Sequence, residues 1–86
     1  MNNRPPWTYA GRHYRVQAFS DVADRDGYGW ELEDVAPAPG FGTIAEVFLD
    51  DTSGAFTVTW FTDRPLPLAL VERFIREASA GVPPTA

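Results

Sequence analysis

The clearest alternation of apolar and polar side chains runs over residues 43–61. Successive side chains of a strand point to opposite faces, and each half of this stretch places three apolar residues on one face. They are Ala45, Val47 and Leu49 in the first half, and Phe56, Val58 and Trp60 in the second. Residues 50–55 between the halves contain Asp, Ser and Gly, which favour turns. The pattern predicts a hairpin with Asp50 opposite Ala55.

This register places the three apolar residues of the first face opposite the three apolar residues of the second, with all six on one side of the hairpin. The pairs are Leu49–Phe56, Val47–Val58 and Ala45–Trp60. A shift by one residue would place these side chains opposite Glu46 and threonines, so the burial of one face penalises it.

A helix is predicted after the hairpin. Pro65 cannot donate to a ladder and therefore ends the second strand, whereas Pro67 suits the first turn of a helix. Apolar residues then recur at helical spacing up to a stop at Gly81. They are Leu70, Val71, Phe74, Ile75 and Ala78. We expect the helix to cover the hairpin face that carries Val47, Leu49, Val58 and Trp60.

The N-terminal half predicts a second hairpin, because residues 12–19 and 28–34 also alternate. A register that matches apolar faces also brings opposite charges together across the ladder, which is mildly stabilising. Its pairs are Tyr14–Leu32, Val16–Trp30, Arg15–Glu31 and His13–Glu33.

The predicted fold is therefore α+β: a four-stranded antiparallel sheet of two consecutive hairpins, with one C-terminal helix packed on one face (ββββα). The 86 residues fit a single small domain. Residues 1–7 and 82–86 are expected to form flexible tails.

The composition of the chain argues against several classes of partner and binding site. The net charge of −5 argues against binding to nucleic acids or anionic membranes, and no apolar run is long enough to span a bilayer. The chain has no Cys, which excludes thiolate metal sites, and its start has no secretory signal, so we expect a cytoplasmic protein. Arg without Lys, together with many Ala and Pro, is typical of a GC-rich bacterial genome. We expect no metal and no cofactor.

The predicted sheet has a second, helix-free face, which also carries large apolar groups. The residues placed there are Phe19, Ile44, Phe48 and Phe61, interspersed with Arg15, Glu31 and Glu46. Exposed apolar patches commonly mark protein-binding surfaces. We therefore expect a small acidic binding, adaptor or antidote-type protein that uses this face for another protein or for self-association as a homodimer. Alternatively, the N-terminal segment with Trp7 and Tyr9 folds back over the face.

Two other functions remain open. A small enzyme or ligand carrier could use a cleft near His13 and Glu31 or Glu33, with the histidine as a base oriented by a carboxylate. The chain could instead be an accessory subunit of a larger complex. No residue is assigned a catalytic role, because no nucleophile is placed beside His13.

Overall fold

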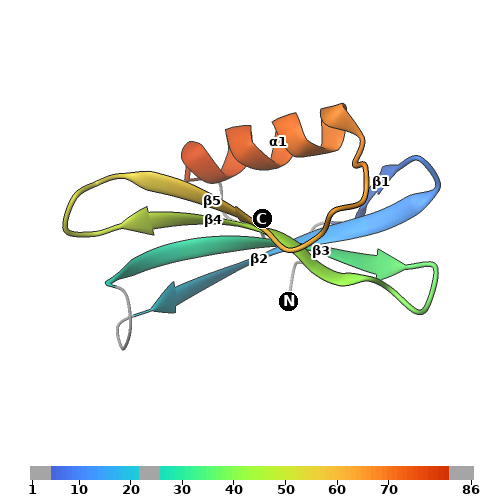
Figure 1. Ribbon diagram of the computed structural model, residues 1–86, viewed down its shortest axis with the longest axis horizontal. Coiled ribbons are helices and arrows are strands. Elements are labelled where there is room, and N and C mark those ends of the chain that lie inside the picture. Colours follow the sequence, from blue (N-terminus) through green and yellow to red (C-terminus); the bar gives the residue numbers. More distant parts are fainter. Residues whose placement is uncertain (1–4, 22–25, 82–86) are drawn as a thin grey trace.

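The computed structural model describes residues 5–21 and 26–81, in which five antiparallel strands pair in chain order beneath one helix (Figure 1). The elements are β1 (Trp7–Tyr9), β2 (Arg12–Asp21), β3 (Gly27–Ala36), β4 (Gly42–Asp50), β5 (Phe56–Trp60) and α1 (Leu68–Ser79). The predicted α+β arrangement, a helix on one face of an antiparallel sheet, is confirmed, although the sheet has five strands rather than four. Residues 1–4 and 82–86 of the predicted tails, and residues 22–25 between the first two predicted strands, lie outside the described residues.

The additional strand, β1, begins at Trp7, the last residue of the predicted N-terminal tail, and continues through Tyr9. Ala10 and Gly11 join β1 to β2 with φ angles of 50° and 78°. Two consecutive positive φ angles are typical of the two-residue turns that match the twist of a hairpin. Trp7 pairs with Tyr14 and is buried on the helix side of the sheet. Trp7 and Tyr9, the residues expected to fold back over the helix-free face, instead belong to a strand that extends the sheet, and both pack with the core on the helix side.

The predicted register of the first hairpin is wrong by two residues. Val16 lies opposite Leu32, and Arg15 lies opposite Glu33 rather than Glu31. His13 lies opposite Ala36, beyond a bulge that leaves Val35 without a partner. A two-residue shift keeps every side chain on its own face, so the apolar pattern does not distinguish the two registers.

The second hairpin has the predicted register: Ala45 faces Trp60, and Val47 faces Val58. Its turn begins with Asp50, whose backbone N–H donates to the carbonyl of Ala55 at 2.9 Å. The Asp50 side chain accepts hydrogen bonds from the backbone N–H groups of Thr52 and Ser53, at 2.7 Å and 3.1 Å. The turn therefore forms through the side chain-to-backbone bonding expected of Asp.

The helix α1 packs its apolar stripe on the central strands. Leu70, Phe74 and Ala78 are buried against a core that includes Leu32 and Val47. One flank of α1 is directed towards β1. On that flank the guanidinium of Arg73 lies 4.0 Å above the Trp7 ring and bonds to Glu77 at 3.1 Å. No helix among the described residues is long and apolar enough to cross a membrane.

Candidate functional site

The helix-free face is less available for binding than its sequence pattern suggests. Ile44, Phe48 and Glu46 are buried, with Phe48 only 4% exposed. Phe48 stacks on Phe19 at a centroid distance of 6.3 Å. The Phe19 ring lies over Gly29, its partner across the ladder, and the end of the Phe48 ring lies over Gly27. The aromatic side chains of this face thus fill the space that these glycines leave in the sheet.

The placement of Ile44 on the helix-free face is wrong because of a bulge. Leu32 pairs with Ala45 and Glu33 pairs with Thr43, so Ile44 is an extra residue in β4. A bulge re-aims the side chain at its site. Ile44 is only 1% exposed and belongs to the core cluster packed beneath α1.

The charged residues predicted on the helix-free face have the partners that the observed strand register gives them. Arg15 donates to Glu33 at 2.9 Å, and Glu31 lies opposite Glu46. Of the four apolar residues predicted there, Phe61 alone is an exposed large side chain, and it follows the end of β5.

The histidine and the glutamates do not form the predicted acid–base set. The Nδ1 atom of His13 lies 2.9 Å from the Thr8 hydroxyl, and Glu33 is bonded to Arg15 instead. Among the described residues, no group of three His, Asp or Glu side chains is placed to hold a metal ion.

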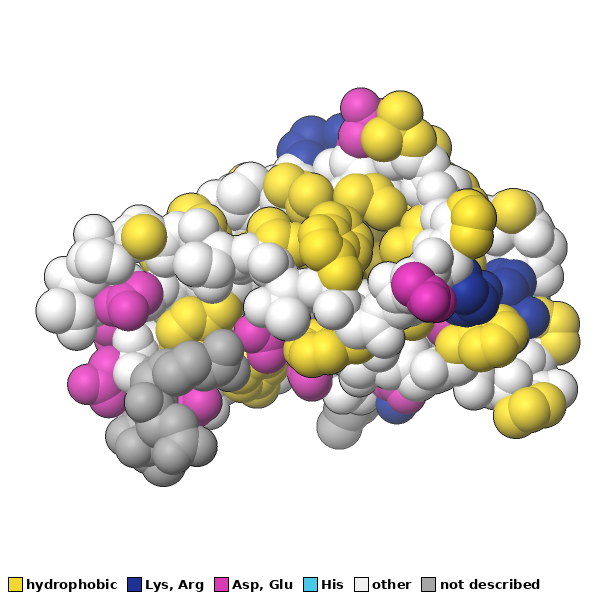
Figure 2. Space-filling model, in the orientation of Figure 1, with side chains coloured by type: hydrophobic (Ala, Val, Ile, Leu, Met, Phe, Trp, Pro, Cys, Tyr) yellow, Lys and Arg dark blue, Asp and Glu magenta, His cyan; other side chains and the backbone are white. Residues whose placement is uncertain are grey.

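A row of exposed apolar side chains instead lies along β5, on the helix side of the sheet. Phe56, Val58 and Trp60 are 43%, 40% and 47% exposed. We call these three residues the β5 strip. The expectation that α1 covers Val58 and Trp60 is wrong, because the core on which the helix packs is formed by residues of β1, β2, β3 and β4. Figure 2 shows hydrophobic side chains gathered on the surface below α1.

The backbone of β5 is also open, because β5 is an edge strand. The carbonyl of Ala55 accepts from Asp50, and the N–H of Phe61 donates to Ile44 at 2.9 Å. Residues that bond to a given neighbour alternate along an antiparallel strand. The odd-numbered residues of β5 therefore bond to β4, and the residues of the β5 strip direct their N–H and C=O groups away from the sheet.

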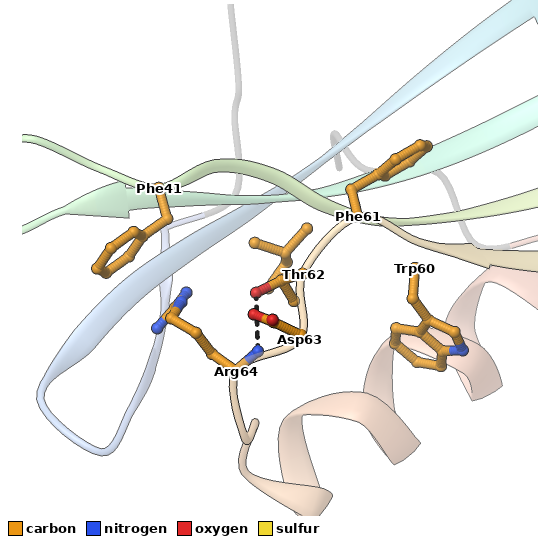
Figure 3. A pocket seen from close by; sticks show the side chains of 7 residues that line it. Phe41, Trp60, Phe61, Thr62, Asp63 and Arg64 are labelled. Atoms are coloured by element: carbon orange, nitrogen blue, oxygen red, sulfur yellow. Dashed lines mark hydrogen bonds between the residues drawn. The ribbon is translucent and has the colours of Figure 1, made fainter.

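The β5 strip continues into an open pocket of about 650 Å³. Its lining residues are Phe41, Ile44, Trp60, Phe61, Thr62, Asp63 and Arg64. In Figure 3 Trp60 points towards the helix, whereas Phe61 points to the opposite side of the chain. The turn that follows is held by the backbone N–H of Arg64, which donates to the Thr62 hydroxyl at 3.2 Å.

Charged groups at the end of this pocket are already engaged with each other. The Arg64 guanidinium lies 3.6 Å above the Phe41 ring, on which Arg12 also stacks at 4.5 Å. Arg12 and Arg64 both reach the buried carboxylate of Asp34, at 2.7 Å and 3.8 Å. This cluster joins β2, β3 and the link to α1, so it holds the pocket wall in place.

The charges around Asp34 also set its ionisation. Burial opposes ionisation, but hydrogen bonds from Arg12 and the Phe41 N–H, with the charges of Arg12 and Arg64, outweigh it and lower the pKa of Asp34. The carboxylate is therefore an anion that neutralises two cations, which suits a structural role.

The β5 strip could have been recognised only in part from the sequence. The alternation that predicts β5 identifies these three side chains, and the absence of charged residues between Asp51 and Asp63 is the further signal that this strand has an unprotected edge.

Comparisons with protein-family models, with curated protein sequences and with solved structures found no match to this chain.

Proposed function

We propose that the chain is a small protein-interaction domain that binds its partner through the β5 strip. The observation that carries this proposal is an edge strand, paired on one side only, whose side chains on the helix side of the sheet are apolar and 40–47% exposed. Edge strands of monomeric proteins are usually protected by charge, proline or short length. β5 has no charged residue and no proline. An exposed apolar strand of this kind is suited to pairing with a strand of another protein chain.

The surroundings of the β5 strip resemble the anatomy of a protein interface. An apolar centre with aromatic side chains is bordered by polar groups at both ends of the strand: Asp51 in the turn, and Asp63 and Arg64 after the strand. Interface cores are enriched in aromatic residues and depleted of charge, while rims are polar. The proposal keeps the protein-binding role expected from the sequence and moves it from the helix-free face to β5.

Capture from the native host tests this function. The chain carrying one affinity tag is expressed beside a copy carrying a different tag, and captured proteins are identified by mass spectrometry. We expect the native chain to retain at least one protein, either a host protein or the differently tagged copy. The Val58→Arg variant should not retain it.

The matched control is Gln17→Arg, which places the same charge at an exposed position of β2. This control should retain whatever the native chain retains. A captured set that is the same for the native chain and for Val58→Arg would contradict the proposal.

A further inference from the structure

We propose that the partner of the β5 strip is the β5 strip of a second copy of this chain. In this dimer the two strands pair antiparallel, and Val58 lies on the two-fold axis. The inference rests on the proposed function, because it identifies the partner of the same surface. It is carried by three separate properties of β5: its free backbone groups, the symmetry of its side chains and its lack of charge.

The backbone groups determine the register. Val58 directs both its N–H and its C=O away from β4, as do Phe56 and Trp60. In an antiparallel pair, a residue that exchanges both bonds with its opposite residue forms a hydrogen-bonded pair. With Val58 opposite Val58 of the second copy, Phe56 lies opposite Trp60 of that copy. The free backbone N–H and C=O groups of Phe56, Val58 and Trp60 are then all hydrogen-bonded to the second copy.

The side chains of β5 are arranged symmetrically about Val58. In this register two aromatic Phe56–Trp60 pairs flank a central Val58–Val58 pair on the helix side of the joined sheets. Aromatic and β-branched cross-strand pairs are among the stabilising combinations in antiparallel sheets. On the other side, Thr57 lies opposite Thr59 of the second copy, and threonine pairs are also favourable. The strand is therefore complementary to itself.

Charge does not oppose this pairing within the strand. Residues 52–62 carry no charged side chain. If the same register is extended past the strand, Asp63 falls opposite Ser53 of the second copy and not opposite Asp51. Directly opposed like charges, which would be destabilising, are thus avoided.

The assembly is expected to close at two copies. A contact between identical edges is isologous and uses both β5 edges, which leaves only the two β1 edges free. β1 has three residues, follows Pro5 and Pro6, and buries Trp7 beneath the helix. Short strands and prolines are features that protect an edge from pairing. Pairing of β5 with β1, which would build an open fibre, is therefore disfavoured.

Cysteine cross-linking tests the register directly, because the chain has no Cys of its own. In the proposed dimer the Cα atoms of the two Val58 residues are about 5.5 Å apart, and those of Thr57 and the opposite Thr59 about 4.5 Å. Both distances allow a disulfide, whereas Thr57 lies about 7–8 Å from Thr57 of the second copy, at or beyond the limit.

We expect Val58→Cys to form a covalent dimer under mild oxidation. Thr57→Cys alone and Thr59→Cys alone should stay largely unlinked, while an equimolar mixture of the two should cross-link. Cross-linking of Thr57→Cys alone to the same extent as the mixture would overturn the register. Absence of cross-linking in all samples, Val58→Cys included, would overturn the dimer.

Sedimentation equilibrium measures the association without cross-linking. The native chain should have twice the 9.5 kDa chain mass, and Gln17→Arg should have the same mass. Val58→Arg should sediment as a single chain with an unchanged far-UV circular dichroism spectrum, because it opposes two charges across the axis. A monomeric native chain, or an open-ended series of larger species, would overturn the inference.

The two proposals can fail separately. If the native chain is monomeric but captures another protein from its host in a way that Val58→Arg abolishes, the self-pairing is wrong and the protein-interaction function is supported. If the native chain neither self-associates nor captures any protein that depends on Val58, both are wrong.

Discussion

Arg12 and Asp34 form a bidentate ion pair that joins the beginning of β2 to β3. The Nε atom of Arg12 donates to one oxygen of Asp34 at 2.7 Å, and a terminal nitrogen donates to the other at 2.9 Å. The Asp34 carboxylate also accepts from the backbone N–H of Phe41 at 3.3 Å. A bidentate pair of this kind has a defined geometry. It therefore fixes the segment between β3 and β4, which carries Phe41 against Arg64.

Replacing Asp34 should destabilise the protein strongly and change its response to acid. Asp34→Asn keeps the shape but leaves two arginines without their anion. Removing one member of a buried ion pair costs about 3–5 kcal/mol, and we expect the lower end because both arginines remain partly exposed. Urea unfolding of the native chain and of the variant at pH 7 measures this difference in free energy.

The acid response follows from the pKa of Asp34, which is lowered in the folded state. The stabilisation it contributes is complete above the unfolded-state pKa of about 3.9, and is lost as the pH falls through the lower folded-state pKa. The stability difference between the native chain and Asp34→Asn should therefore be constant from pH 7 to pH 5 and shrink below pH 4. A difference that is the same at pH 3 as at pH 7 would contradict this role.

The substitution Gly29→Ala should lower the stability of the native chain but raise the stability of a variant that lacks the Phe19 ring. A Cβ atom at Gly29 would overlap the ring of Phe19. In the native chain, Gly29→Ala should therefore cost about 1–2 kcal/mol, as typical overpacking does. In a Phe19→Ala background the space is open, and the same change should stabilise the strand by about 0.5 kcal/mol because Ala loses less entropy than Gly.

A double-mutant cycle of these variants, followed by thermal or urea unfolding, measures the coupling. The background variant Phe19→Ala is its own control for the loss of the ring. If Gly29→Ala has the same effect with and without Phe19, the ring does not occupy this space in solution.

The sequence predicts the β4–β5 hairpin well because its information is local. Asp50 begins a turn whose bonds lie within five residues, and a slip by one residue would exchange the faces of both strands. The β2–β3 hairpin has no such anchor in the pattern. A shift of two residues keeps Tyr14 and Val16 on the same face, so burial does not select between the two registers. The bulges at Val35 and Ile44 leave no mark in the alternation.

The candidate site was missed for a reason of size. A helix is about 10 Å wide and strands lie about 4.8 Å apart, so one helix covers about two or three strands. Which strands it covers depends on how many the sheet contains. The sequence pattern places Trp7 in a tail, so it predicts four strands, and a helix over four strands is expected to reach Trp60. The core beneath α1 is drawn from β1 to β4, with Arg73 of the helix stacked on Trp7, and the side chains of β5 lie beyond it and are exposed.

The turn between β1 and β2 should become more stable when Ala10 is replaced. Ala10 has a φ of 50°, a region that is unfavourable for a residue with a Cβ and better tolerated by Asn. Asn-Gly is also the preferred pair for this type of turn. Ala10→Asn should raise the free energy of unfolding by about 0.5–1 kcal/mol. The control is Ala80→Asn, an exposed position with a φ of −85°, where no gain is expected. Equal effects at both positions would show that the turn geometry is not the cause.

Self-association through β5 should become tighter as salt is added. Each copy carries a net charge of −5, so two copies repel each other, while the residues that meet in the β5 contact are uncharged. Salt shortens the screening length from about 10 Å at 0.1 M to about 3 Å at 1 M and weakens the repulsion without weakening apolar burial. The dimer dissociation constant from sedimentation equilibrium should fall several-fold between 0.05 M and 0.5 M sodium chloride. A dissociation constant that rises with salt would instead indicate a contact held by opposite charges, such as Arg64 against the acidic turn at Asp50 and Asp51 of the second copy, and would place the interface away from Val58.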